Sequence, residues 1–201
     1  MATSARRIQK ECKEVITAAE LADLGISIDI VSEGSFNRIN AEIRGPPDTP
    51  YEGGRFKLDV VFPPDYPFKP MIVTFITKVW HPNVSSQTGI ICLDILKERW
   101  LASLSLRVVL LSIQNLLACP EPRDPQDAVV AKQYMAEREI WNKTARFWTQ
   151  QFAAGPGAKS EEMQGLVKAV MREIGSEVEA VSLLSCNGWD ANRAIAYSRS
   201  I

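Results

Sequence analysis

The chain has 201 residues, 46% of them hydrophobic, and its 23 Lys and Arg against 24 Asp and Glu give a formal net charge of −1. This size allows one domain of ordinary size plus a small appendage. The balanced charge argues against nucleic acid as a partner, and one His with four separated Cys residues argues against a Cys/His zinc site. No run resembles a membrane span or a signal peptide. We therefore expect a cytoplasmic or nuclear protein with no membrane partner and no metal or cofactor.

The first third of the chain predicts a helix followed by strands. The helix is expected over residues 4–18, with Ser4 as its N-cap. The apolar positions that recur there at helical spacing are Ile8, Cys12, Val15 and Ile16. Apolar runs that follow predict strands at 26–30, 39–43, 56–62 and 71–76. Because the links between them are short and rich in Gly and Pro, we expect an antiparallel meander.

The rest of the chain is expected to be irregular and then helical. No period persists between Thr77 and Leu101, and an irregular stretch of this length in a compact domain is typical of a functional loop. Helices are predicted over 106–118, 127–134 and 138–152.

Residues 153–160 resemble a linker in composition, and the segment beyond them predicts three short helices. Ser176 and Asp190 are the expected caps of the second and third of these helices. The side chains expected to form their small core are Val167, Val170, Met171, Val178, Val181, Leu183, Leu184, Trp189, Ala194 and Ile195.

Two residues in the irregular stretch carry candidate chemistry. Asn83 lies in Trp-His-Pro-Asn-Val, and Cys92 lies nine residues later in Gly-Ile-Ile-Cys-Leu-Asp. A thiolate is a strong nucleophile, and an Asn amide can donate a hydrogen bond to a developing oxyanion. A cysteine hydrolase would have to use His81 as its base, because the chain has no other histidine. With Pro82 fixing the backbone beside it, His81 is interpreted as structural.

Residues 1–152 resemble the catalytic domain of ubiquitin-conjugating enzymes. The motifs that carry this resemblance are Gly-Pro-Pro-Asp-Thr-Pro-Tyr-Glu-Gly-Gly at 45–54, Tyr-Pro-Phe-Lys-Pro at 66–70, His-Pro-Asn at 81–83, Gly-Ile-Ile-Cys-Leu-Asp at 89–94, and Trp100. The linker 153–160 and residues 161–201 resemble the ubiquitin-associated (UBA) domain of one branch of that family, and residues 121–131 are similar to the same branch. The resemblance implies an α+β fold: an N-terminal helix, a four-stranded antiparallel meander, C-terminal helices and a small three-helix UBA-like bundle.

The resemblance also implies roles for the site residues. Cys92 would accept ubiquitin from the activating enzyme as a thioester, and a lysine of a substrate or of ubiquitin would attack it, which allows chain formation. Asn83 would donate to the oxyanion or brace the loop that shapes the site. Asp124 would orient the incoming lysine and help to remove its proton, although a turn or capping Asp is the alternative interpretation. Asp94, with His81 and Pro82, would shape the site.

The resemblance further implies contact surfaces on a protein that we expect to be a monomer. The activating enzyme would contact the basic residues of the first helix, Arg6, Arg7, Lys10 and Lys13. Ligases of the RING type would contact Phe68, Trp100, Leu101 and Ala102, where Ala102 replaces a common proline. Ubiquitin would contact the tail at Ile174 and Gly175, where the sequence Ile-Gly-Ser replaces the family's Met-Gly-Phe loop.

Three other functions stay open from the sequence. A conjugating enzyme for another ubiquitin-like modifier would keep the fold, but the UBA-like tail favours ubiquitin. A non-catalytic adaptor would be a binding module, but Cys92 is present. A cysteine hydrolase would pair Cys92 with His81. Arg123 stands where related enzymes often carry an acid, which could change the preferred acceptor.

Overall fold

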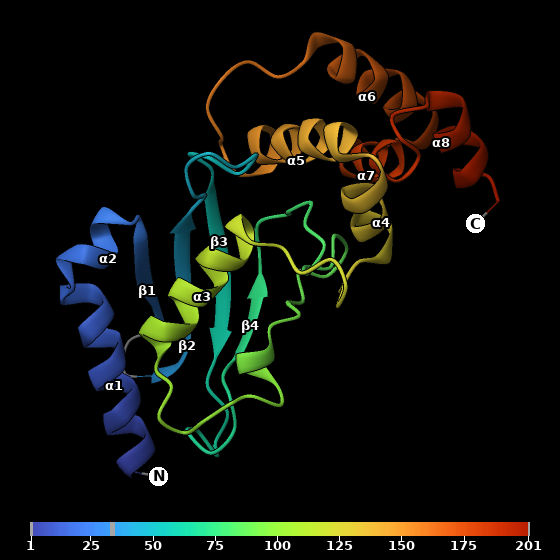
Figure 1. The fold of residues 1–201 in the computed structure, drawn as a ribbon. Coiled ribbons are helices and arrows are strands. Elements are labelled where there is room, and N and C mark those ends of the chain that lie inside the picture. Colours follow the sequence, from blue (N-terminus) through green and yellow to red (C-terminus); the bar gives the residue numbers. More distant parts are fainter. Residues whose placement is uncertain (1, 33–34, 201) are drawn as a thin grey trace.

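A four-stranded antiparallel sheet forms the centre of the computed structural model, which describes residues 2–32 and 35–200 (Figure 1). The strands are β1 (Ile26–Ser32), β2 (Ser35–Arg44), β3 (Arg55–Val61) and β4 (Ile72–Phe75). They pair in chain order, with Ile26 opposite Ile43 and Ile43 opposite Phe56. The predicted antiparallel meander is therefore confirmed.

Helices precede and follow the sheet. They are α1 (Ala2–Thr17), α2 (Ala19–Asp23), α3 (Leu106–Ala118), α4 (Ala128–Ala136) and α5 (Arg138–Phe152), with a single 3₁₀ turn, η1, at Asp94–Leu96. The bounds predicted for α3 and α5 are confirmed, and α2 was not predicted. The prediction that Ser4 caps α1 is wrong, because the helix already begins at Ala2.

The main core lies between the sheet and the helices. In Figure 1, α3 crosses one face of the sheet while α1 and α2 lie beside β1. Alternate residues of β3, namely Phe56, Leu58 and Val60, are fully buried, as a strand with one face against a core requires. Ile16, one of the apolar positions at helical spacing, is 59% exposed. It follows the buried Val15 by one position, and this step of about 100° around the helix turns it to solvent.

Three further helices form a tail bundle, which we define as residues 161–200. They are α6 (Glu161–Ile174), α7 (Glu177–Cys186) and α8 (Ala191–Ser198). The predicted caps are confirmed, since the side chain of Ser176 accepts from the Glu179 amide and that of Asp190 from the Arg193 amide. None of the helices in the described part of the chain combines the length and the apolar character that a membrane span requires.

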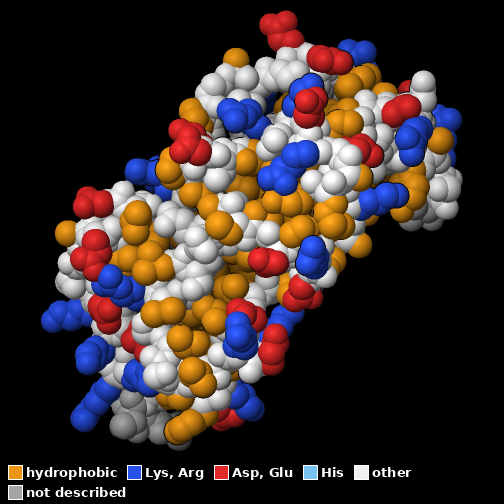
Figure 2. Space-filling view, viewed as in Figure 1, with side chains coloured by type: hydrophobic (Ala, Val, Ile, Leu, Met, Phe, Trp, Pro, Cys, Tyr) orange, Lys and Arg blue, Asp and Glu red, His pale blue; other side chains and the backbone are white. Residues whose placement is uncertain are grey.

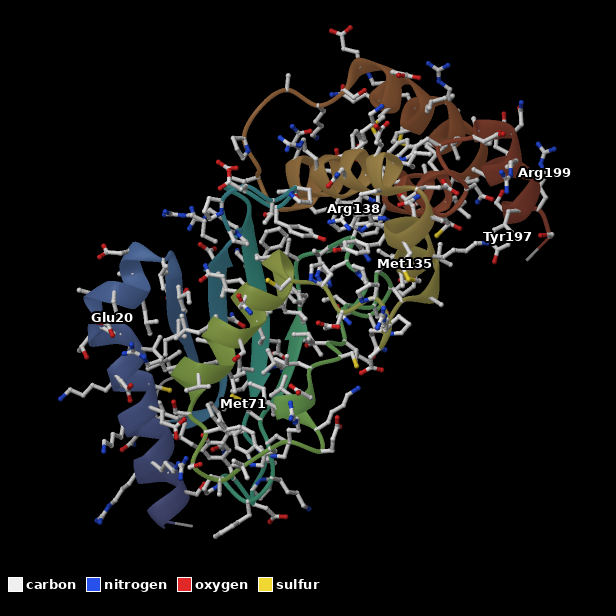
Figure 3. All side chains as sticks on the ribbon, viewed as in Figure 1. Glu20, Met71, Met135, Arg138, Tyr197 and Arg199 are labelled. Atoms are coloured by element: carbon white, nitrogen blue, oxygen red, sulfur yellow. The ribbon has the colours of Figure 1, made fainter. Side chains whose placement is uncertain are left out.

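Two predicted members of the tail core lie at its surface instead. Met171 is 36% exposed and Val178 is 43% exposed. Both are on helices whose other apolar residues, such as Val170 and Val181, already fill the small space between the three helices. Figure 3 shows Tyr197 and Arg199 at the C-terminal end of α8, on the outside of the bundle.

The tail bundle packs against α5 and α4 through buried polar contacts. Ser185 of α7 is fully buried, and its hydroxyl accepts a 2.8 Å hydrogen bond from the Trp148 indole of α5. Its backbone carbonyl accepts a 3.2 Å hydrogen bond from the Gln133 amide of α4. The Trp189 indole donates to the Thr144 hydroxyl at 2.9 Å. Because an unpaired buried indole or amide is costly, these contacts favour the docked arrangement.

Candidate active site

A small backbone loop places Cys92 next to Asn83. The Cys92 amide donates to the Asn83 carbonyl at 2.8 Å, and the Ser85 amide donates to the Ile90 carbonyl at 2.9 Å. The chain turns back toward Cys92 at Gly89. Only glycine suits this position, because its φ is +75° and a Cβ there would lie 2.1 Å from the Phe75 carbonyl oxygen. The nine-residue spacing of Asn83 and Cys92 therefore puts them side by side.

The Asn83 side chain joins this loop to the segment before α4. Its Oδ1 accepts from the Glu121 amide at 2.8 Å, and its Nδ2 donates to the carbonyls of Glu121 and Asp124, both at 2.9 Å. The Pro82 carbonyl also accepts from the amides of Gln126 and Asp127. Asn83 is 1% exposed. In this state the carboxamide acts as a brace, and neither of its N–H groups is left for a further partner.

The Cys92 sulfur is half-buried and lies between two charged side chains. The Asp124 Oδ2 is 3.5 Å from the sulfur, and the Lys97 Nζ is 3.2 Å from it. The structure thus brings Asp124 to Cys92 as the resemblance implied. Lys97 was not singled out in the sequence, and its position five residues after Cys92 gives no periodic signal for such a contact.

His81 has no access to Cys92. It is fully buried, its Nε2 lies 2.9 Å from the Leu116 carbonyl, and its Nδ1 accepts from the Asn83 amide. Burial lowers the pKa of His81 to about 3, so the ring stays neutral throughout the physiological pH range. Both ring nitrogens are therefore committed to structure, and the hydrolase arrangement with Cys92 is not formed.

Asp94 contributes to the shape of the turn that follows Cys92. Its carboxylate pairs with Arg99 at 3.0 Å and accepts from the Ile95 amide at 2.7 Å. A groove of about 530 Å³ runs beside this turn and α3, between Leu93, Leu111 and Cys119. Among the described residues, no group of three His, Cys, Asp or Glu side chains could hold a metal ion.

The remaining thiols differ in exposure. Cys12 is buried, and burial raises its pKa to about 11. Cys119 and Cys186 are exposed by accessible area. The pKa of Cys186 is nevertheless raised to about 11. The main cause is burial by neighbouring atoms, and the charge of Asp127 makes a smaller contribution. Cys92 is the thiol that lies against both an ammonium and a carboxylate.

A buried carboxylate organises the surfaces expected to contact partners. Glu11 of α1 is 6% exposed, and it accepts from Arg7 at 2.8 Å, from the Tyr66 hydroxyl at 2.7 Å and from the Leu106 amide at 2.8 Å. Arg7 is therefore partly committed to the core. The sequence did not predict that Glu11 is buried, because a Glu among basic residues on a helix is usually exposed to solvent.

The other predicted contact residues are mostly at the surface. Arg6, Lys10 and Lys13 are exposed, and basic side chains project along the edge occupied by α1 (Figure 2). Phe68 is 83% exposed and Leu101 is 62% exposed. Trp100 is half-buried, because its indole donates to the Pro67 carbonyl at 2.8 Å and ties their two loops together. Ala102 and Ile174 are half-buried, and Gly175 and Arg123 are exposed.

Buried hydrogen bonds connect the tail bundle to the active-site segment. Gln133, which donates to Ser185, also accepts a 2.8 Å hydrogen bond from the Trp80 indole. Trp80 directly precedes His81 and packs on Trp148, with ring centroids 5.1 Å apart. The tail therefore packs on the residues beneath the site and not on an unrelated surface.

Comparison with known proteins now decides the family. A family model described as ubiquitin-conjugating enzyme matches residues 7–149. This chain belongs to the ubiquitin-conjugating enzyme family. Ubiquitin-conjugating enzyme E2 K of Homo sapiens is 48% identical over 190 residues, which cover 94% of both chains. Ubiquitin-conjugating enzyme E2-22 kDa of Drosophila melanogaster is 47% identical over 189 residues, again 94% of both chains.

A solved structure agrees with the fold. The E2 domain of a Toxoplasma gondii ubiquitin conjugating enzyme superposes with a TM-score of 0.66 and is 51% identical, covering 74% of this chain and 97% of that one. The protein is thus a transferase of the ubiquitin conjugation pathway, which works by thioester exchange. The fold implied by the sequence motifs is confirmed for the catalytic part.

Proposed function

We propose that Cys92 is the residue on which this conjugating enzyme carries ubiquitin. The observation that supports this most directly is a half-exposed thiol between a carboxylate and an ammonium, next to the braced Asn83. During loading, the sulfur attacks the thioester of the activating enzyme, whose own thiol leaves. During discharge, a lysine amine attacks the new thioester. A groove beside η1 and α3 can accommodate the extended C-terminus of ubiquitin.

The lack of an imidazole near Cys92 suits transfer better than hydrolysis. His81 is neutral and fully hydrogen-bonded, so it cannot activate water. A thioester needs no further activation to react with an amine. Asp124, 3.5 Å from the sulfur, is placed to orient an incoming lysine ammonium and accept its proton.

Loading can be tested with activating enzyme, ATP and ubiquitin. We expect the wild-type chain to form an adduct that a thiol reductant removes, because the bond is a thioester. Cys92→Ser should lose that reductant-sensitive adduct, whereas Cys186→Ser, which changes an exposed thiol of the tail bundle, should keep it. The readout is a gel with and without reductant. Loading of Cys92→Ser as a reductant-sensitive adduct would reject the assignment, and loading only with another modifier would reject ubiquitin as cargo.

Asn83 is proposed to act in discharge by holding Asp124 and, once the thioester has formed, by releasing the Glu121 carbonyl so that the freed N–H donates to the oxyanion. We expect Asn83→Ser to slow discharge onto free lysine by about 10²-fold, in the range seen when an oxyanion donor is lost, with a much smaller effect on loading. The measurement is single-turnover discharge of a loaded enzyme. An equal loss in both steps would contradict the oxyanion role.

The Asp124→Ala variant separates the two proposed roles of Asn83. If Asn83 acts only through Asp124, the double variant should discharge no more slowly than Asp124→Ala alone. If it also donates to the oxyanion, removal of Asn83 should slow the Asp124→Ala enzyme further.

The loop tip at Phe68 is proposed as the anchor for RING-type ligases, together with Leu101 on the neighbouring loop. A largely exposed aromatic side chain is a frequent source of binding energy at interfaces. Phe68→Ala should lose the acceleration of discharge that a cognate RING ligase gives, by tenfold or more for a loss of about 1.4 kcal/mol. Discharge without ligase should stay at the wild-type rate, and retained acceleration would argue against this surface.

The tail bundle is proposed to be a UBA domain that binds ubiquitin weakly and favours chain formation. Gly175, in a left-handed conformation, and Ile174 lie in the loop between α6 and α7. Ser176 stands where the family's pattern has an aromatic residue, and its side chain caps α7.

Weak ubiquitin binding by the tail can be measured by NMR titration of the ¹⁵N-labelled full chain. We expect the amides of Ile174 and Gly175 to shift, with a Kd of the order of 1 mM, about −4 kcal/mol. Ile174→Asp should abolish these shifts by placing a charge in an apolar contact. An unchanged spectrum at millimolar ubiquitin would overturn the proposal.

A further inference from the structure

Lys97 places a cation against the proposed nucleophile. Its Nζ lies 3.2 Å from the Cys92 sulfur. Asp124 Oδ2 lies 3.5 Å from the same sulfur. The reaction described above uses the carboxylate to handle the incoming amine. It leaves the ammonium, which is in direct contact with the reacting sulfur, without a role.

The turn after Cys92 brings the Lys97 side chain back to the Cys92 sulfur. The Leu96 amide donates to the Leu93 carbonyl at 3.0 Å, and the Lys97 amide donates to the Asp94 carbonyl at 2.9 Å. The Lys97 carbonyl in turn accepts from the Trp100 amide at 3.2 Å. Because both backbone polar groups of Lys97 are held, its side chain starts from a defined point. A preorganised charge of this kind needs little rearrangement during a reaction.

Among the described residues, no carboxylate lies within ion-pair distance of Lys97. The nearby Asp94 is paired with Arg99 at 3.0 Å. The hydrogen bond to Cys92 is the largest cause that raises the pKa of Lys97, with smaller contributions from Asp124 and Glu98. Lys97 is therefore an ammonium at neutral pH and a hydrogen-bond donor, not a free amine.

We propose that Lys97 is a catalytic residue whose ammonium stabilises the negative charge that develops on the Cys92 sulfur when the thioester breaks. The proposal rests on the thioester chemistry proposed above. As an acceptor amine attacks the carbonyl, a C–N bond forms and the C–S bond breaks. The electron pair of the C–S bond stays on the sulfur as a thiolate beside Lys97, and the amine proton leaves to Asp124 or water.

This cation stabilises the transition state more than the loaded enzyme. A thioester sulfur is neutral, whereas the departing sulfur carries negative charge, so the attraction to Lys97 grows as the bond breaks. Lys97 therefore acts on the discharge step through one contact.

Alkylation of the unloaded enzyme tests the contact without ubiquitin. Iodoacetamide is added to the full chain, and the Cys92 peptide is quantified by mass spectrometry. At pH 7, Lys97→Met should react roughly fivefold more slowly than wild type, the order expected for one exposed charge in contact with the sulfur. Lys97→Arg should stay within about twofold of wild type because it keeps the charge. Lys57→Met, which removes an exposed cation on β3, should match wild type.

Two further measurements separate a charge effect from a change in structure. At pH 11, where thiols ionise with or without a nearby cation, the rates of wild type and Lys97→Met should converge. Lys97→Gln, a second neutral replacement, should reproduce Lys97→Met. Discharge of the loaded Lys97→Met enzyme onto free lysine should also slow by roughly fivefold, with Lys97→Arg restoring the rate.

Three outcomes would overturn the proposal. These are wild-type alkylation of Lys97→Met at pH 7, equally slow alkylation of Lys97→Arg and Lys97→Met, or transfer of ubiquitin onto Lys97 itself while Lys97→Met alkylates normally. Failure of the wild-type chain to load ubiquitin, with the alkylation pattern intact, would instead reject the thioester function and leave the interaction of Lys97 with the sulfur established.

Discussion

The Asn83 carboxamide is the contact on which the geometry of the site depends. It joins the loop that carries Cys92 to the segment that carries Asp124, through one hydrogen bond accepted from the Glu121 amide and two donated to backbone carbonyls. Each such bond contributes about 0.5–1.5 kcal/mol net. A side chain of this shape therefore determines where the carboxylate lies relative to the sulfur.

Charge at the site is arranged for acyl transfer. The sulfur lies between Asp124 and Lys97, while the single imidazole is buried, neutral and hydrogen-bonded to backbone. As proposed, the carboxylate can orient the incoming amine and accept its proton, and the ammonium can stabilise the negative charge on the departing sulfur. Neither group needs to generate hydroxide, which is what a hydrolase would require of its base. Under the proposed assignment of Cys92, these residues suit the transfer of ubiquitin to an amine.

The tail bundle is connected to this site through the interior of the catalytic domain. Ser185 accepts hydrogen bonds from Trp148 and Gln133, and Gln133 accepts one from Trp80, which directly precedes the His-Pro-Asn segment. If the tail moved away, Trp148 and Gln133 would each lose a buried partner. Docking of the tail and order of the active-site segment are therefore linked, and by thermodynamic reciprocity each stabilises the other.

The sequence by itself determined the features that depend on short-range rules. The meander followed from alternation and short turns, the caps at Ser176 and Asp190 from local hydrogen bonds, and the placement of Cys92 and Asn83 in one irregular loop from motif and spacing. Only the tertiary structure decided which side chains met across long separations in the chain. It brought Asp124, 32 residues away in the chain, to 3.5 Å from the Cys92 sulfur. It also turned Met171 outward although its spacing suited a core. The physical reason is that periodicity and turn chemistry act over a few residues, whereas burial and charge pairing depend on how whole elements pack.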